Sequence, residues 1–304
     1  MEYLRQKTIL LTGGTGFIGR PLSRALADRG AQILVLTRSS RVSSKNISYI
    51  SSLAEISDKK IDIIINFAGE PIAQRWTPAA KQKIRNSRIE TTSSLVGFIK
   101  SSSVKPSIFI SASAIGYYGT DQNTEFNENT PPKNTALFSR ELCSAWEAEA
   151  LKAEKYGVKT VILRIGAVLE KSGGMLAKLL PPFRLGLGGP IGHGRQWLSW
   201  IDRDDLIRLI LHTLQAPSIN GPVNATAPNP VSNREFSEAL ADVLRRPCLL
   251  STPAFALRAA FGDMADEIML EGQKVVPRKA EESGFTFFYP TIQSSLEKIF
   301  KGNP

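Results

Sequence analysis

The chain has 304 residues, of which 42% are hydrophobic and 22% are charged. This balance is typical of an ordinary globular protein and argues against a disordered or fibrous chain. The net charge of +10 is spread along the sequence, with one modest concentration over residues 75–88 and no RNA-binding or helix-turn-helix motif beside it. We therefore expect a basic surface that favours an anionic ligand, and no nucleic-acid partner.

Several features that the sequence lacks indicate the expected cellular location and exclude some kinds of site. The first residues do not show the apolar core and cleavage site of a signal peptide, and the apolar runs are far shorter than the roughly 20 residues of a membrane helix. Cys143 and Cys248 are too few for a disulfide framework. His193 and His212 have no partners at metal-ligand spacing. We expect a cytoplasmic protein with no membrane partner and no metal site, and we leave the oligomeric state open.

Strands and helices alternate through the first half of the chain, which is the pattern of a parallel sheet covered by helices on both faces. The sequence predicts a fold of the α/β class: a doubly wound parallel sheet (Rossmann) with a smaller, mainly helical C-terminal substrate domain. The apolar spacing predicts strands at 8–12, 33–37, 61–67, 107–113 and 160–165, and helices at 19–28, 79–100 and 139–155.

The composition changes after residue 166, and glycine and proline are frequent from there to residue 194. A helical pattern at 202–214 and a short strand at 223–225 then predict a return to the first domain. We therefore expect residues 1–165 to form an NADP-binding Rossmann domain, with 202–226 returning to it. Residues 166–304 are expected to form the substrate-side region.

A glycine-rich segment at 12–19 lies between the first predicted strand and the first predicted helix, which is the context of a dinucleotide-binding loop. Gly13 permits the sharp turn, Gly16 lets the backbone approach a diphosphate, and Gly19 lets helix and strand pack closely. Free amides at the start of the helix bind the phosphates. The candidate residues of this loop are Gly13, Thr15, Gly16, Phe17, Ile18 and Gly19.

The end of the second strand indicates which dinucleotide is bound. NAD sites usually carry a carboxylate there for the ribose 2′-hydroxyl, whereas this chain has Thr37 and Arg38. A guanidinium pairs with a 2′-phosphate that a carboxylate would repel. We therefore expect NADP(H) as the cofactor; the alternative is that Arg38 points to solvent.

Three features together resemble the extended short-chain dehydrogenase/reductases: the glycine spacing, the strand end Asn-Phe-Ala-Gly at 66–69, and the segment at 111–119. More narrowly, the chain is similar to the epimerase-family branch that includes SDR39U1. The supporting segments are 87–92, 180–192, 200–202 and 270–277, and the family-specific C-terminal segment extends over 248–297.

This resemblance implies a Rossmann domain, NADP(H) and a substrate pocket between that domain and the C-terminal part. It implies that Thr37 and Arg38 hold the phosphate of the adenosine end, and that the strand end at 66–69 lines the adenine and ribose side. Arg88 would reach a cofactor phosphate, and Lys83 either shares its face or lies on an exposed helix surface. The added candidate cofactor residues are Phe67, Ala68, Gly69, Lys83 and Arg88.

Enzymes of this group pair a serine with a Tyr-x-x-x-Lys motif, in which the lysine lowers the pKa of the tyrosine and the tyrosine moves the proton. Ser113 matches the serine, but about 25 residues further on the chain has Phe138 and Leu142. Phenylalanine cannot transfer a proton and leucine supplies no cation. By this alignment the usual acid/base pair is missing.

Three explanations stay open: Tyr117 or Tyr118 replaces the tyrosine, another group such as His193 serves, or the cofactor is bound without turnover. We take Ser113 and Tyr118 as the candidate catalytic residues. The leading hypothesis is an oxidoreductase or nucleotide-sugar epimerase-like enzyme acting on a small hydroxylated or carbonyl substrate, with an anionic group that Arg184 or Arg195 could bind. The rival is a catalytically silent NADP(H)-sensing regulator or interaction protein.

Overall fold

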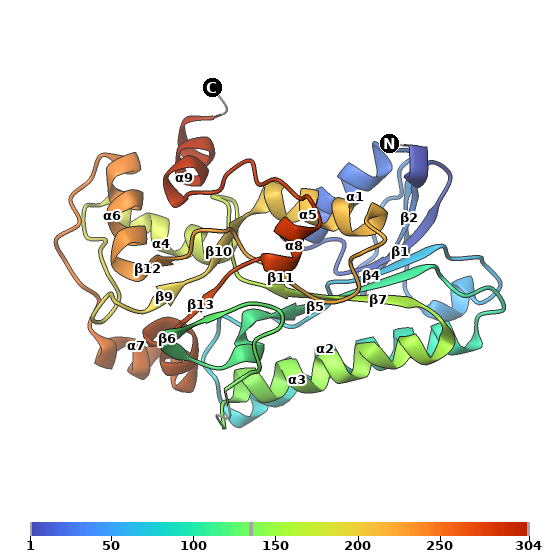
Figure 1. The fold of residues 1–304 in the computed structure, drawn as a ribbon, viewed down its shortest axis with the longest axis horizontal. Helices are drawn as coiled ribbons and strands as arrows, with labels where there is room; N and C mark the ends of the chain where they lie inside the picture. The colour runs from blue at the N-terminus through green and yellow to red at the C-terminus, as the bar shows by residue number, and fades with distance from the viewer. Residues whose placement is uncertain (1, 134–135, 303–304) are drawn as a thin grey trace.

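The computed structural model describes residues 2–133 and 136–302. Its centre is a sheet of seven strands, all paired in parallel, in the order β11-β7-β5-β4-β1-β2-β3 (Figure 1). The order reverses at β1, so a crevice opens outside the carboxyl ends of β1 and β4, where doubly wound folds bind ligands. The strands are β1 (Thr8–Thr12), β2 (Gln32–Leu36), β3 (Ile47–Ile50), β4 (Ile63–Asn66), β5 (Ile108–Ala114), β7 (Lys159–Ile165) and β11 (Gly221–Ala225).

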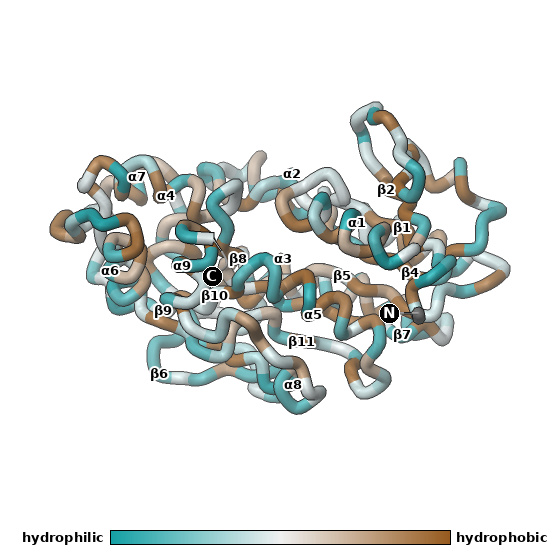
Figure 2. The backbone as a smooth tube through the Cα atoms, turned by 90° about the horizontal axis from the view of Figure 1, so that it is seen from above, coloured by the Kyte–Doolittle hydropathy of each residue, from teal (hydrophilic) through white to brown (hydrophobic). Residues whose placement is uncertain are grey.

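Helices cover both faces of this sheet. Figure 1 shows α2 (Pro78–Ser101) and α3 (Phe138–Leu151) along one face, and α1 (Gly19–Ala27) and α5 (Arg203–Gln215) along the other. Side chains alternate between the faces because the strand period is two: Ile9 and Leu11 pack under α1 and α5, and Leu10 packs under α2. In Figure 2 the residues of β1 and β2 appear as hydrophobic stretches.

The predicted α/β fold is confirmed, with every predicted strand and helix of the first half present within a few residues. Sequence reasoning missed the edge strand β3, because its pattern Ile-Ser-Tyr-Ile is short and only its last residue is buried. β11 pairs with β7 and lies at one end of the strand order.

The second part of the chain is mainly helical, as predicted. Its own apolar cluster joins α4 (Gly174–Arg184), α6 (Asn233–Leu244) and α9 (Ile292–Lys301). Phe285 and Phe287, however, pack in the same cluster as the β1 side chains. The last part of the chain therefore contributes to the core of the first part. The remaining strands and α-helices are β6 (Asp121–Phe126), β8 (Ala167–Leu169), β9 (Trp197–Leu198), β10 (Trp200–Asp202), β12 (Val231–Ser232), α7 (Ala254–Phe261), β13 (Gln273–Val275) and α8 (Arg278–Glu282).

Within the described residues, no helix combines the length and the apolar character required to cross a membrane.

Candidate functional site

The glycine loop between β1 and α1 is folded tightly against the end of β4. Gly13 has φ +68°, a left-handed conformation that glycine adopts without cost. A Cβ at Gly13 would lie 2.5 Å from the carbonyl oxygen of Phe67, and one at Gly19 would lie 2.2 Å from the carbonyl oxygen of Gly13. Both positions therefore exclude any side chain, which keeps the loop and the helix start close to the strand ends.

The start of α1 is suited to an anion. The helix begins at Gly19 after Ile18, and no side chain caps it, so the first amides have no side-chain acceptor of the usual capping kind. Gly16 is exposed, and Thr15, Phe17 and Ile18 are partly exposed around it. A glycine turn leading into an uncapped helix N-terminus fits the diphosphate of a dinucleotide.

The adjoining strand ends carry the other candidate cofactor residues. Thr37 and the exposed Arg38 follow β2 directly. The partly exposed Phe67 and Ala68 follow β4, and the Ala68 amide donates to the Thr12 hydroxyl at 3.2 Å. Because β2, β1 and β4 are neighbours in the sheet, these side chains all border the same crevice.

Arg88 and Lys83 have different environments on α2. The Arg88 guanidinium lies against Gly69, where a Cβ would be 2.9 Å from its Cζ atom. Its Nη1 donates to the carbonyl oxygens of Glu70 and Ile84, both at 3.1 Å. Burial lowers the pKa of Arg88 from its usual value. Lys83 is exposed. Arg88 therefore holds the backbone that follows β4, whereas Lys83 lies on the helix surface.

Ser113, at the end of β5, belongs to a buried polar network. Its Oγ donates to Oε1 of Glu147 at 2.7 Å. Glu147 also accepts two hydrogen bonds from Arg164, from Nε at 3.0 Å and from Nη2 at 2.8 Å. The side chains of Arg164 and Glu147 are only 4% and 7% exposed. The serine proton is thus directed at Glu147, which leaves the Oγ lone pairs as acceptors for another group.

Tyr118 lies at the far side of the same network. Its hydroxyl donates to Oδ1 of Asn224 at 2.8 Å and accepts from Nη1 of Arg164 at 3.0 Å. The residue is 0% exposed. Burial raises the pKa of Tyr118 to about 12, although Arg164 acts in the opposite direction. A tyrosine activated for proton transfer has a lowered pKa. The role of Tyr118 as proton donor stays a prediction, and this arrangement does not favour it.

The residues of α3 that face Ser113 lie one position further along the sequence than expected. Ser139 and Cys143 pack against Gly116, just after β5, and Glu147 binds Ser113 itself. These residues are spaced by four, so they form one face of the helix. The expectation that Phe138 and Leu142 take the tyrosine and lysine positions is therefore corrected: Ser139 and Cys143 face the site.

The conclusion that the usual pair is missing survives this correction, because serine and cysteine do not reproduce a tyrosine with a neighbouring lysine. Burial raises the pKa of the Cys143 thiol to about 11. Cys143 is therefore a packed neutral side chain near neutral pH.

Phe138 and Leu142 pack instead in an apolar cluster with Trp76, Ile84 and Met264. The Phe138 and Trp76 rings meet edge to face with centroids 5.0 Å apart. This cluster joins α2 and α3 to the segment after α7.

Glu267, from the C-terminal part, caps the start of α3. Its carboxylate accepts from the amides of Phe138 at 3.1 Å and Ser139 at 2.8 Å, and from the Ser139 hydroxyl at 2.7 Å. Negative charge at a helix N-terminus is stabilising. The C-terminal part therefore fixes the start of the helix whose Glu147 binds Ser113.

The other candidate, His193, lines a separate surface hollow of about 450 Å³ that does not include Ser113. Its Nδ1 accepts from the amide of Arg195 at 2.9 Å. Among the described residues, no group of three or more His, Cys, Asp or Glu side chains could hold a metal ion.

Comparison with known sequences identifies the family. The model of the NAD dependent epimerase/dehydratase family matches residues 9–225, more than half of the chain. The chain belongs to this family. A second model, described only as a domain of unknown function (DUF1731), matches residues 252–299. The epimerase/dehydratase match contains the glycine loop and Ser113, and the second match contains Glu267.

Relatives from a plant and a bacterium are similar to this epimerase/dehydratase family member over almost its whole length. The chloroplastic SDR39U1 homologue of Arabidopsis thaliana is 43% identical, over 97% of this chain and 87% of its own. The epimerase family protein YfhF of Bacillus subtilis is 37% identical, over 96% of this chain and 97% of its own. The predicted resemblance to the SDR39U1 branch is confirmed.

Solved structures of the epimerase/dehydratase fold agree with the topology. The crystal structure of human epimerase family protein SDR39U1 (isoform 2) with NADPH matches with a TM-score of 0.88 and 31% identity, over 97% of this chain and 100% of that chain. UDP-N-acetylglucosamine 4-epimerase from Bacillus cereus matches with a TM-score of 0.75 at 18% identity, over 97% and 99% of the two chains. The second likeness shows a shared fold and nothing more.

Proposed function

We propose that this chain binds NADP(H) in the crevice at the carboxyl ends of β2, β1 and β4. The observation that carries the proposal is the combination of an uncapped, glycine-lined start of α1 with a guanidinium, Arg38, at the end of β2. The NADPH present in the human SDR39U1 structure supports the same cofactor here.

Different residues of the crevice bind different parts of the cofactor. The amides of the loop from Gly13 to Gly19, with Thr15, Phe17 and Ile18 around them, bind the diphosphate. Thr37 and Arg38 bind the 2′-phosphate, with a charge-assisted pair from the guanidinium. Phe67, Ala68 and Gly69 line the adenosine side, and Arg88 holds the backbone that follows them at Glu70. Lys83 adds positive charge from the helix surface.

We further propose an oxidoreductase or epimerase-like reaction on a small hydroxylated or carbonyl substrate, in a protein of the cytoplasm. The nicotinamide supplies hydride transfer when it is bound. Ser113 orients the substrate: because its own proton is directed at Glu147, its oxygen accepts a hydrogen bond from a substrate hydroxyl. The carboxyl end of β5, where Ser113 lies, borders the crevice beside β4.

The test of the cofactor site is a fluorescence titration with NADPH and with NADH. The Arg38→Ala variant should bind NADPH about tenfold more weakly or worse, because a charge-assisted contact is lost, and should bind NADH as the unchanged chain does. Arg29→Ala, at the opposite end of α1 from the glycine loop, is the matched control and should change neither affinity. Wild-type protein that binds neither nucleotide would overturn the proposal.

A second function is favoured by the α3 face, which presents Ser139 and Cys143 in place of an acid/base pair. In this alternative the chain is an NADP(H)-sensing regulator or interaction protein without turnover. Ser113→Ala would then leave the cellular role intact, while Arg38→Ala would impair it. Loss of the cellular role in a folded, NADPH-binding Ser113→Ala protein would exclude the regulator and favour the enzyme.

A further inference from the structure

A loop from the second part of the chain lies directly on the glycine loop. A Cβ at Gly173 would lie 2.4 Å from Cδ2 of Phe17, and one at Gly174 would lie 3.2 Å from Cε1 of the same ring. Gly174 also has φ +65°. Only a backbone without side chains can pass this close to the ring. The loop after β8 is therefore shaped to cover Phe17 at the start of α1.

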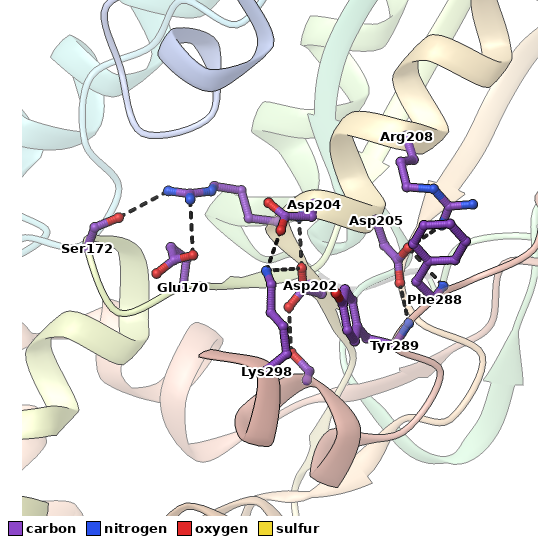
Figure 3. A network of polar contacts seen from close by, with 11 residues as sticks. Glu170, Ser172, Asp202, Asp204, Asp205, Arg208, Phe288, Tyr289 and Lys298 are labelled. Carbon is purple, nitrogen blue, oxygen red and sulfur yellow. Dashed lines mark hydrogen bonds and ion pairs between the residues drawn. The ribbon is translucent and has the colours of Figure 1, made fainter. Parts of the chain in front are cut away.

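Arg203, the first residue of α5, holds this loop in place through Ser172 and Glu170, the two loop residues labelled in Figure 3. Its Nη1 donates to the Ser172 hydroxyl and its Nη2 to Oε2 of Glu170, both at 3.0 Å. Its Cζ lies 5.5 Å from the centre of the Phe17 ring. Its Nε is buried and has no hydrogen-bond partner among the described residues. A guanidinium at this distance from a ring is attracted to the ring face.

We propose that Arg203 is a positioning residue of the dinucleotide site, acting through the loop at 170–174 and through Phe17. The proposal rests on the proposed NADP(H) function and adds to it a residue outside the glycine loop. By clamping the loop on the Phe17 ring, Arg203 fixes the backbone whose amides face the diphosphate.

The structure offers a matched control on the same helix. Arg208 is also paired with a carboxylate, Asp205, at 2.6 Å, and its Cζ also lies over an aromatic ring, that of Phe288, at 3.2 Å. Arg208 therefore pairs with the same kinds of group as Arg203, a carboxylate and an aromatic ring. Its partners, however, belong neither to the glycine loop nor to the loop that covers Phe17.

The experiment is an NADPH fluorescence titration of the full chain. Arg203→Gln should raise the Kd for NADPH about tenfold, because the charged contact that holds the loop at Glu170 is lost. Arg208→Gln should leave the Kd within about twofold of the unchanged chain. Arg203→Lys should recover part of the loss, because it keeps the charge but not the fork that joins Ser172 and Glu170. An unchanged Kd for Arg203→Gln, or an equal loss in Arg208→Gln, would overturn the proposal.

A backbone variant tests the same clamp if Arg203→Gln does not fold. Gly173→Ala should weaken NADPH binding, since its Cβ displaces the loop or the ring. Gly97→Ala on α2 should not, because its Cβ would meet nothing within 4 Å apart from the backbone of its own helix. NADPH binding in Gly173→Ala equal to that of the unchanged chain would count against the clamp. Failure of the unchanged chain to bind NADPH is a separate result, which removes the proposed function first.

Discussion

Replacing Glu147 with glutamine should strongly destabilise the protein, because it leaves the Arg164 charge buried without a counter-charge. Glu147 accepts three hydrogen bonds, one from Ser113 and two from Arg164, and both ionic side chains are less than a tenth exposed. Removing one partner of such a pair typically costs about 3–5 kcal/mol. We expect a loss of this size in the free energy of unfolding of Glu147→Gln.

The assay is urea unfolding at neutral pH, with the midpoint and the slope both measured so that a change in stability is separated from a change in the unfolded state. Glu149→Gln is the matched control on the same helix. Its partner Lys152 is 52% exposed, and surface ion pairs contribute about 0–1 kcal/mol. A loss below about 1 kcal/mol in Glu147→Gln, or equal losses in the two variants, would refute the reasoning.

A second change distinguishes the uncompensated charge from a general packing defect. Adding Arg164→Met to Glu147→Gln removes the orphaned charge, so the double variant should be more stable than Glu147→Gln alone. A double variant that is less stable than the single one would show that the cost comes from lost packing or from the Tyr118 contact.

Three further outcomes follow from individual contacts. Gly13→Ala should lose at least about 1–2 kcal/mol in urea unfolding, because its left-handed φ disfavours a side chain and its Cβ would meet the Phe67 carbonyl; wild-type stability would contradict this. Tyr118 keeps its proton up to about pH 12 when folded but loses it above its usual pKa of 10.0 when unfolded, so stability falls between these values, by up to about 2–3 kcal/mol. Tyr118→Phe, compared by unfolding at pH 9 and 11, should show a shallower decline; an identical decline would count against a raised pKa. Glu267→Ala should cost about 1–2 kcal/mol in thermal unfolding through loss of the cap on Ser139 and its neighbours, and an unchanged midpoint would mean that the cap is not needed.

The parts of the fold that sequence predicts are those set by local physics. The period of the apolar residues gives β1, α1, β2, β4 and α2, because each of these elements buries one face or lies wholly inside. The glycine loop is predictable for a similar reason: the strand, the turn and the helix that give it meaning are adjacent in sequence. β3 was missed because it lies at the sheet edge with little burial.

The partners in the site were beyond the sequence because they depend on tertiary packing. A spacing of four does group Ser139, Cys143 and Glu147 on one face of α3, but it equally groups Phe138 with Leu142. Which face turns to β5 is set by contacts with α2 and with the segment after α7, which lies more than 100 residues away in the chain. One residue, Glu147, could have indicated the network, because it is an acidic residue in the middle of an apolar helix face. A buried carboxylate is rarely found without a cation beside it.

The last part of the chain fixes the first residues of two helices, α3 and α5. This argues that the two regions matched by the family models, 9–225 and 252–299, work as one unit. Glu267 caps α3. The N-cap of α5 is Asp202, whose carboxylate is fully buried. Lys298 of α9 holds it at 3.0 Å (Figure 3), and the Ser295 hydroxyl donates to it at 2.9 Å. Burial raises the pKa of Asp202, and Lys298 opposes that effect. Without α9 the carboxylate would lose its cation, and the start of α5, where Arg203 reaches the loop over Phe17, would lose its anchor. Removing α9 should therefore weaken cofactor binding.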